Sequence, residues 1–234
     1  MTFVKFYPYR LTPVNRFATP ARCYNIGMRN ILFTAFEPFD GRGENASLLA
    51  MAAIRPSAFR GRRLHRARLP VDGLAVERRL PRLLADLKPE LLVSLGLAAG
   101  ETAVRVERFA LNIKDYRIKD NAGRRPEGRP VYRQGPAAYI VNTDPAAMAA
   151  AARRAGVPAV VSNHAGAYVC NHLMYAAMRA IDEGGLDTRF AFIHLPLTTE
   201  MALAENPGVP VPPSLPLPAL ARAVEQAALA ALRG

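Results

Sequence analysis

Short, unbroken apolar runs recur along the sequence and alternate with longer amphipathic stretches. The clearest runs are ILFTAF at 31–36, LLVSLGL at 91–97 and FAFIHLPL at 190–197. Continuous apolar runs of this length are typical of strands that are buried on both faces, as in parallel sheets. Parallel strands need long crossover connections, and helical patterns separate the runs here. The sequence therefore predicts a three-layer α/β/α fold, with a mainly parallel twisted sheet covered by helices on both faces.

The rest of the chain extends this alternation. Further strands are predicted in the alternating segment 104–112 and in PAVVSNHAG at 158–166. Helices are predicted at 46–54, 74–87, 145–156, 171–182 and from 219 to 234. The 234 residues suit one domain with a sizeable core. Because no linker interrupts residues 29–234, we expect them to form a single catalytic α/β domain.

The first 28 residues differ from the rest of the chain. They hold four basic residues, no acidic residue and no clear period. They also lack the apolar core of a secretory signal. Met28 stands directly before the first predicted strand, so we expect 1–28 to be a disordered basic extension or to lie upstream of the true start. The intact mass of the protein from its native host distinguishes these cases, since a mature chain beginning at Met1 excludes the second.

The charge and the cysteine content narrow the class of protein. The net charge of +12 includes an arginine-rich stretch at 60–68, which has no interleaved aromatics and matches no nucleic-acid motif. We interpret this stretch as solvated surface and expect no nucleic-acid partner. No apolar run approaches the roughly 18–20 residues of a membrane span, so no membrane partner is expected. Two isolated cysteines indicate a reducing compartment, and we expect a cytoplasmic protein.

Cys170 lies between the predicted strand at 158–163 and the helix at 171–182. In open α/β sheets the reactive groups gather beyond the carboxyl ends of the strands. The backbone N–H groups and the dipole of a helix start favour a thiolate, which is the nucleophilic form of cysteine. A lone cysteine is also commonly a buried, unreactive core residue. Its position alone leaves both interpretations open.

A cysteine nucleophile needs a base, and the chain offers four histidines. His172 projects about 200° away from Cys170 around the same helix, so the two side chains are not expected to meet. His65 lies in the arginine-rich stretch without a positional argument. His164 precedes the cysteine in a turn, and His194 ends a predicted strand. The residues favour His194 over His164, with a half-buried, unreactive histidine as the alternative.

An acidic residue that orients the imidazole would complete a triad. Glu107 stands inside the apolar alternation VRVERFALN, and Asp115 and Asp120 follow it. Glu107 could instead form a surface ion pair with Arg105 or Arg108. The residues by themselves do not choose among these acids.

The loop after the first strand reads FEPFDGRGENAS. Phe36 and Phe39 flank a proline there, and aromatics in such a loop either plug the core or form the wall of a small apolar pocket. The glycines are too few and wrongly spaced for a dinucleotide fingerprint or a phosphate loop. We therefore expect no cofactor and no metal.

At this point the sequence resembles a known family. FEPFDGRGENAS is similar to the FEPFGG…NPS signature of pyroglutamyl peptidase I, also called pyrrolidone-carboxylate peptidase. The similarity continues in order through GLAAGETAVRVERFALNIKDYRIKDNAG, GPAAYIVNT, GVPAVVSNHAGAYVCNHLMY and FIHLPL, and covers roughly residues 30–200. The family is one of α/β/α cysteine peptidases that remove an N-terminal pyroglutamate from peptides. Its members often form dimers or tetramers, so the resemblance implies a homodimer or homotetramer.

The resemblance also implies roles for particular residues. The family triad falls on Glu107, Cys170 and His194, and it selects Glu107 over the two aspartates. The resemblance implies an apolar slot for the pyrrolidone ring, lined by Phe36, Phe39, Ile118, Tyr168 and Val169. It also implies that Asn45, in the signature loop, and Arg117, beside the reacting carbonyl, bind the substrate. The expected partner is thus a peptide that begins with pyroglutamate.

The chain departs from the family pattern near the implied site. Leu97 and Glu101 stand where the family usually has glutamine and arginine, and Tyr168 replaces a phenylalanine of the pocket wall. Further departures are Asp40, Ala46, Lys119 and His164. None of them removes a triad residue, so the resemblance implies a divergent member. Two alternatives remain, a hydrolase of related cyclic or N-blocked amides and a non-catalytic relative that binds peptides.

Overall fold

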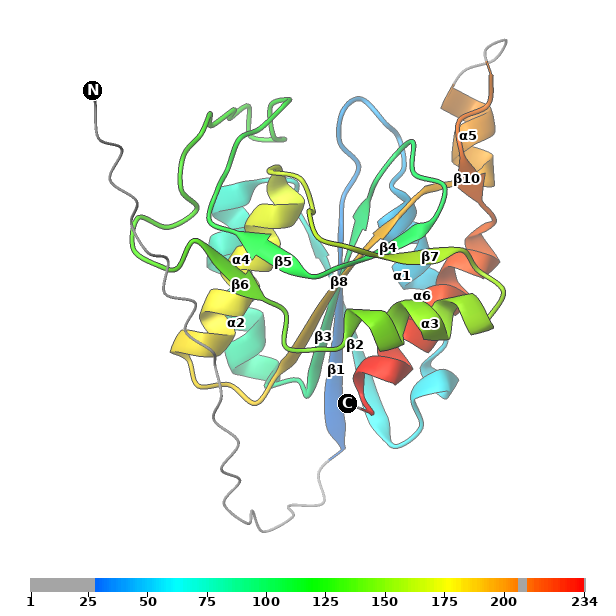
Figure 1. Cartoon of the computed structure of the whole chain (residues 1–234), viewed down its shortest axis with the longest axis horizontal. Coiled ribbons are helices and arrows are strands. Elements are labelled where there is room, and N and C mark those ends of the chain that lie inside the picture. The colour runs from blue at the N-terminus through cyan, green and yellow to red at the C-terminus, as the bar shows by residue number, and fades with distance from the viewer. Residues whose placement is uncertain (1–27, 206–209, 234) are drawn as a thin grey trace, which may run out of the picture.

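The computed structural model describes residues 28–205 and 210–233, and its layers surround one central sheet (Figure 1). Six strands form this sheet, in the order β2-β1-β3-β8-β4-β7. Their bounds are β1 Arg29–Phe36, β2 Arg62–Leu69, β3 Leu91–Leu97, β4 Val104–Glu107, β7 Ala159–Ser162 and β8 Arg189–Leu195. The predicted α/β/α fold with a mainly parallel sheet is confirmed. The prediction for the N-terminal extension falls on residues outside the described ones, apart from Met28.

Two strands of the sheet run against the other four. β1, β2, β3 and β8 are mutually parallel, whereas β4 pairs antiparallel with β8 and parallel with β7. The strand direction therefore reverses between β8 and β4. This boundary brings residues from oppositely directed strands side by side, which a purely parallel sheet would not do.

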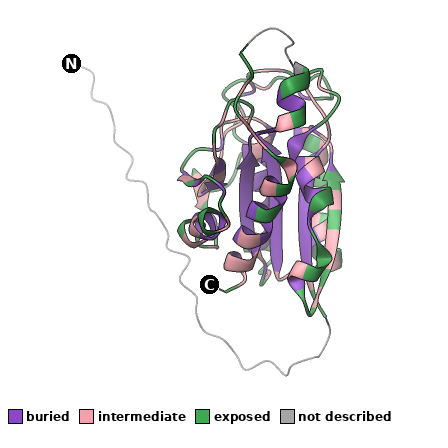
Figure 2. Ribbon diagram, turned by 90° about the vertical axis from the view of Figure 1, so that its right-hand side faces the viewer, coloured by how far each residue is buried: buried purple, intermediate pink, exposed green. Residues whose placement is uncertain are grey.

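One face of the sheet is covered by three helices, α1 (Ala46–Ala53), α3 (Pro145–Arg154) and α6 (Leu217–Ala231). They pack on apolar side chains that point to this face from β1, β3, β4 and β8, among them Val93 and Ile193. α3 and α6 are rich in alanine, which lets two helices approach each other closely. This face holds a continuous apolar core, and the buried strands are seen between the helices in Figure 2.

The other face is covered by α2 (Gly73–Leu87) and α4 (Val169–Glu183). Here the apolar contacts come from the alternate residues of the same strands, such as Leu92, Phe190 and Phe192. α2 keeps its helical course through Pro81, and the side chain of Asp72 caps its first turn. No helix in the described part of the chain is long and apolar enough to cross a membrane.

The arginine-rich stretch forms β2, an edge strand that the sequence did not predict. Arg62 forms an ion pair with Glu90, and Arg66 donates to the carbonyl oxygen of Met51 at 3.0 Å. Charged side chains on an edge strand oppose pairing with another chain. The stretch is therefore partly bonded to its neighbours rather than simply solvated.

The segment predicted as one strand at 104–112 is divided in two, because the chain leaves the main sheet after Glu107. β5 (Phe109–Leu111) pairs with β6 (Ala138–Ile140) in a separate two-stranded sheet. The sequence did not predict β6. The other smaller elements that it did not predict are a 3₁₀-helix at Pro56–Phe59, β9 (Leu197–Thr198), α5 (Thr199–Glu205) and β10 (Ser214–Leu215).

Candidate active site

The register at the β8–β4 boundary places four side chains on the same face of the sheet. Arg105 lies opposite His194, and Glu107 lies opposite Phe192. Residues two apart on a strand point to the same face, and diagonal neighbours across an antiparallel pair are within reach of each other. Glu107 and His194 are such diagonal neighbours, although 87 residues separate them in the sequence.

Glu107 and His194 form a buried pair. Nδ1 of His194 lies 2.9 Å from Oε1 of Glu107, whose side chain is fully buried. Burial alone would raise the pKa of Glu107, but His194, the nearby Ser162 hydroxyl and the charge of Arg105 together bring that pKa below its ordinary value. Because an ionised carboxylate only accepts hydrogen bonds, Nδ1 carries the proton of this contact.

Cys170 comes to the same place from α4. It is the second residue of this helix, whose N-cap, Tyr168, makes no capping hydrogen bond with its side chain. Burial lowers the pKa of His194, but a negative charge on Cys170 and the Glu107 carboxylate outweigh it and raise that pKa to about 10. The neighbours of His194 thus favour its protonated, imidazolium form beside an ionised Glu107.

Gly96 of β3 makes room for this contact. Gly96 lies directly beside His194 in the sheet. A Cβ atom at this position would lie 2.8 Å from Cδ2 of His194, 2.9 Å from Cζ of Phe192 and 3.0 Å from Sγ of Cys170. All three distances are at or below the closest approach of carbon and sulfur atoms, so a side chain here would push the thiol and the imidazole apart. Gly96 was not among the residues predicted for the site.

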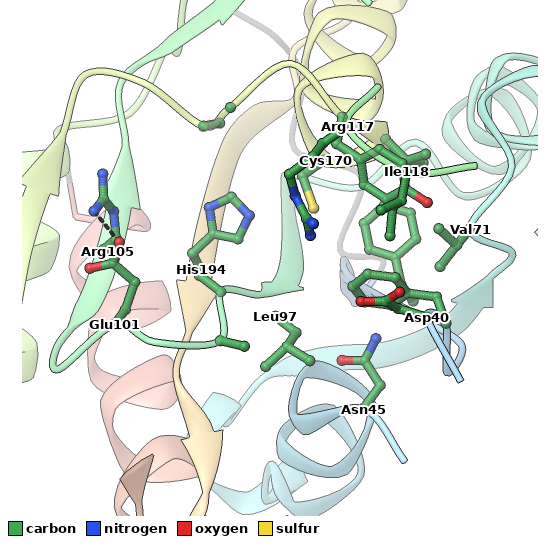
Figure 3. Close-up of a pocket in the computed structure, with 18 of the residues that line it drawn as sticks. Asp40, Asn45, Val71, Leu97, Glu101, Arg105, Arg117, Ile118, Cys170 and His194 are labelled. Carbon is green, nitrogen blue, oxygen red and sulfur yellow. Dashed lines mark hydrogen bonds and ion pairs between the residues drawn. The ribbon is translucent and has the colours of Figure 1, made fainter. Parts of the chain in front are cut away.

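A cavity of about 330 Å³ opens at this point, and all ten residues predicted for the site line it (Figure 3). Glu107, Cys170 and His194 all line it. Its remaining walls include the other predicted residues, Phe36, Phe39, Asn45, Arg117, Ile118, Tyr168 and Val169. Further lining residues that the sequence did not assign to a role include Asp40, Arg42, Val71, Ala98 and Arg105.

The aromatic wall is braced by contacts behind it. The ring of Tyr168 packs against Phe39, with centroids 6.0 Å apart, and edge-on against Tyr116 at 4.9 Å. Its hydroxyl, which a phenylalanine would lack, donates to the carbonyl oxygen of Lys119 at 3.0 Å. This bond ties the wall to the loop that carries Arg117 and Ile118.

Asn45 stabilises the loop that follows β1 through hydrogen bonds of its side chain. Its Oδ1 accepts hydrogen bonds from the backbone N–H and the hydroxyl of Ser47, and its Nδ2 donates to the carbonyl oxygen of Glu37 at 3.0 Å. It is also the N-cap of α1. These bonds hold the loop that carries Phe39 against the cavity.

His172 lies in a second buried cluster behind the pocket wall. Its Nε2 is 2.6 Å from Oε1 of Glu77, and its Nδ1 is 2.7 Å from the hydroxyl of Tyr116. Burial raises the pKa of Tyr116, so its hydroxyl stays protonated and donates to His172. Gly73 allows this packing, since a Cβ atom there would lie 2.5 Å from both Nδ1 of His172 and the hydroxyl oxygen of Tyr116. His172 therefore faces away from Cys170, as its spacing predicts.

The other candidate residues lie elsewhere. His164 lines the cavity, but its Nδ1 accepts from the backbone N–H of Gly166. Asp115 accepts from the N–H of Gly128, and Asp120 from those of Ala122 and Arg124. The geometry thus brings Glu107, and neither aspartate, to His194.

The remaining histidine, His65, contacts Asn30 in the sheet edge. Within residues 28–205 and 210–233, no three His, Cys, Asp or Glu side chains lie close enough together to hold a metal ion.

A thiol at a helix start, an imidazole and a buried carboxylate are the groups that cysteine-dependent amide hydrolases use to form an acyl-enzyme. Comparison with known sequences then places the chain more narrowly. The sequence model of the family described as pyroglutamyl peptidase matches residues 29–234. The chain belongs to the pyroglutamyl peptidase family.

Individual relatives agree with this placement. The pyrrolidone-carboxylate peptidase of Pectobacterium carotovorum subsp. carotovorum is 40% identical over 199 residues, which cover 85% of this chain and 90% of the relative. That of Thermococcus onnurineus is 40% identical over 173 residues, 74% of this chain and 86% of the relative.

Solved structures show the same similarity in three dimensions. Pyroglutamyl peptidase I of Bacillus amyloliquefaciens superposes with a TM-score of 0.81 at 30% identity, over 88% of this chain and 98% of that chain. Pyrrolidone carboxyl peptidase of Thermococcus litoralis gives 0.79 at 32% identity, over 88% and 94%.

Proposed function

We propose that this protein is a cysteine peptidase that hydrolyses the amide bond after an N-terminal pyroglutamyl residue of a peptide. The observation that carries the proposal is the meeting of Cys170, His194 and Glu107 at one cavity with an aromatic and aliphatic wall. Membership of the pyroglutamyl peptidase family supports it.

The cavity suits a pyroglutamyl group. This group is small and uncharged and lacks a free amino group, so it enters an apolar slot without leaving a buried charge. A peptide with an ordinary N-terminus would have to desolvate an ammonium group there, which is costly without a partner. Phe36, Phe39, Ile118, Tyr168 and Val169 form the slot in this proposal.

The reaction begins with attack of the Cys170 thiolate on the pyroglutamyl carbonyl carbon. His194 holds the thiol proton as an imidazolium, and Glu107 stabilises that cation and keeps Nε2 turned to the reacting groups. Collapse of the tetrahedral adduct breaks the C–N bond, and His194 gives its proton to the leaving amine. Water then attacks the thioester with His194 as base, and free pyroglutamate leaves.

The oxyanion of the adduct needs hydrogen-bond donors. The first turn of α4 supplies backbone N–H groups that the Tyr168 side chain does not cap. Arg117 lines the same cavity and adds a positive charge. These donors act on the charge that develops in the transition state, which is where they accelerate the reaction most.

The test is turnover of a chromogenic pyroglutamyl anilide, beside prolyl and N-acetyl anilides. We expect cleavage of the pyroglutamyl anilide by the wild type, its loss in Cys170→Ala and after alkylation with iodoacetamide, and its retention in the control Cys23→Ala. Equal turnover of Cys170→Ala would refute the thiol mechanism. Preference for another N-blocked anilide would refute the substrate.

Three further expectations belong to this proposal. Residues 29–234 form the catalytic unit, in line with the span of the family match. The enzyme acts in the cytoplasm, where a thiol stays reduced. It forms a homodimer or homotetramer, which light scattering of the purified protein checks.

A further inference from the structure

Glu107 is incompletely bonded for a buried carboxylate. Its side chain is fully buried, and Oε1 contacts His194. Within the described residues, Oε2 has no hydrogen-bond partner. A buried ionised group without sufficient partners either costs stability or takes up a proton. A protonated Glu107 could not stabilise an imidazolium, so the site needs another source of positive charge.

Arg105 supplies a positive charge from the same strand. It points to the same face as Glu107, two residues away, and its Nε lies 3.6 Å from Oε1 of Glu107. Its side chain is 27% exposed, so water screens this charge only in part. Arg105 also lines the cavity, and in the view of Figure 3 His194 lies between Arg105 and Cys170.

Two other groups hold the guanidinium of Arg105. Its Nη1 donates to Oε1 of Glu101 at 2.6 Å, and its Nη2 donates to the hydroxyl of Ser162 at 2.8 Å. Ser162 lies opposite Glu107 in the sheet, so this anchor is part of the strand register. With these two bonds in place, Nε is the guanidinium nitrogen that faces Glu107.

We propose that Arg105 is a positioning residue of the site, held by Glu101 and Ser162 so that it keeps Glu107 ionised without taking its carboxylate away from His194. This proposal rests on the proposed function, because Arg105 acts through Glu107 and His194 rather than on the substrate.

The anchors matter because arginine otherwise binds carboxylates with two parallel hydrogen bonds. A guanidinium without these bonds would bind both carboxylate oxygens of Glu107 and compete with His194 for Oε1. With Nη1 and Nη2 already bonded, Arg105 stays at 3.6 Å and Oε1 remains available to the imidazole at 2.9 Å.

The charged and titratable groups around Glu107 are few in the described part of the chain. His194 faces it from β8 and Arg105 from β4, with the Ser162 hydroxyl beside them from β7. Cys170 on α4 and Glu101 after β3 act on it through His194 and Arg105. Among residues 28–205 and 210–233, removal of Arg105 therefore removes the one cation besides His194 that is paired with this carboxylate.

The experiment compares Arg105→Met with the wild type over a range of pH, using pyroglutamyl anilide turnover. Methionine keeps the aliphatic volume and removes the charge. We expect kcat to fall on the order of 10-fold with KM within about twofold, since the change misorients the acid and base rather than the ring slot. The acid limb of the kcat profile is expected to move up by about one pH unit, since loss of a neighbouring cation raises the pKa of a carboxylate.

Two variants distinguish charge from anchoring. Arg105→Lys retains a cation but lacks the planar guanidinium that bonds Glu101 and Ser162. It should therefore keep the acid limb at its wild-type position and leave kcat reduced. Glu101→Gln weakens the tether and should lower kcat while the acid limb stays at or below its wild-type position. The matched control is Arg63→Met, an exposed arginine in edge strand β2, which should behave as wild type.

A second readout needs no substrate. The rate at which iodoacetamide alkylates Cys170, followed by peptide mass, reports the thiolate fraction at each pH. Arg105→Met should shift the acid limb of this rate upward as well. An unchanged kcat and acid limb in Arg105→Met, or an effect on KM alone, would overturn the proposal. Absence of turnover in the wild type would instead refute the proposed function, and the alkylation profile would still test Arg105.

Discussion

Val93, Leu95 and Ile193 point to one face of the central sheet, where they pack in a continuous apolar core against α1, α3 and α6. Gly96 and His194 belong to the same two strands but point to the other face, where they meet Cys170 of α4. Alternate residues of one strand thus contribute to the apolar core on one side and to the proposed catalytic site on the other, because successive side chains point to opposite faces. Substitutions at neighbouring positions are therefore expected to have different consequences.

The largest expected effect is on the chemical face. His194→Ala removes the proposed base and the partner of Glu107, and kcat should fall at least ~10³-fold, as when one member of a catalytic triad is lost. Anilide turnover measures this. Activity within tenfold of wild type would show that the two faces do not differ in the way described.

The neighbouring residue on the packing face should show the opposite pattern. Ile193 is fully buried among apolar side chains. Ile193→Ala should cost about 2–5 kcal/mol of unfolding free energy, because it removes buried methyl groups and leaves a cavity. Denaturant unfolding measures this cost. In folded protein kcat should stay close to wild type, and a large loss of kcat at full folding would contradict the comparison.

Gly96 lies on the chemical face but bears no reactive group. Gly96→Ala should lower kcat on the order of 10²-fold, because the added carbon displaces the thiol from the imidazole and small misplacements are costly in catalysis. Gly43→Ala is a suitable control, since a Cβ atom there meets nothing within 4 Å. Equal activity of both variants would show that the site tolerates the displacement.

The alkaline pH dependence reports on the same contact. Because the pKa of His194 is raised to about 10, the imidazolium is fully present near neutral pH and is lost as pH rises through that value. Activity that depends on the imidazolium should therefore decline about tenfold per pH unit above roughly 10, in line with single-proton linkage. A decline centred near pH 6.5 would show that Cys170 and Glu107 do not raise the pKa of His194.

The smallest expected effect is at the pocket wall. Tyr168→Phe keeps the ring and removes the hydrogen bond to Lys119, which contributes roughly 1 kcal/mol. We expect KM for the pyroglutamyl anilide to rise by less than about fivefold with kcat nearly unchanged, because the loop of Arg117 and Ile118 loosens. A large fall in kcat would place Tyr168 closer to the chemistry than its position indicates.

Much of the fold could be predicted because buried strands can be recognised in the sequence as short, continuous apolar runs. The apolar runs at 31–36, 91–97 and 190–197 became β1, β3 and β8. β2 could not be recognised, because an edge strand needs little apolar surface and its arginines find partners only in the folded sheet. The reversed direction of β4 and β7 was equally hidden, since hydrophobic pattern carries no information about strand direction.

The residues of the candidate site could be predicted from the sequence only in part. Cys170 and His194 stand at the ends of predicted elements, where α/β folds place reactive groups. The choice of Glu107 needed the family resemblance, because its contact with His194 arises from the pairing of strands that are distant in sequence. Gly96 was not predicted for the same reason, and Arg105 was considered only as a surface ion-pair partner of Glu107, whereas the structure pairs it with a buried Glu107. The proposed roles of both residues depend on which side chains the strand register places beside them. The residue type alone does not predict those neighbours.

The place of β8 in the sheet has a consequence for synthesis of the protein. β8 is the last of the six strands to leave the ribosome, yet it lies between β3 and β4 in the middle of the sheet. Until residues 189–195 emerge, the two halves of the sheet have no shared ladder, and Cys170 has no imidazole beside it. A nascent or truncated chain therefore carries Cys170 without this neighbour, and the proposed thiol–imidazole pair exists only once β8 has joined the sheet.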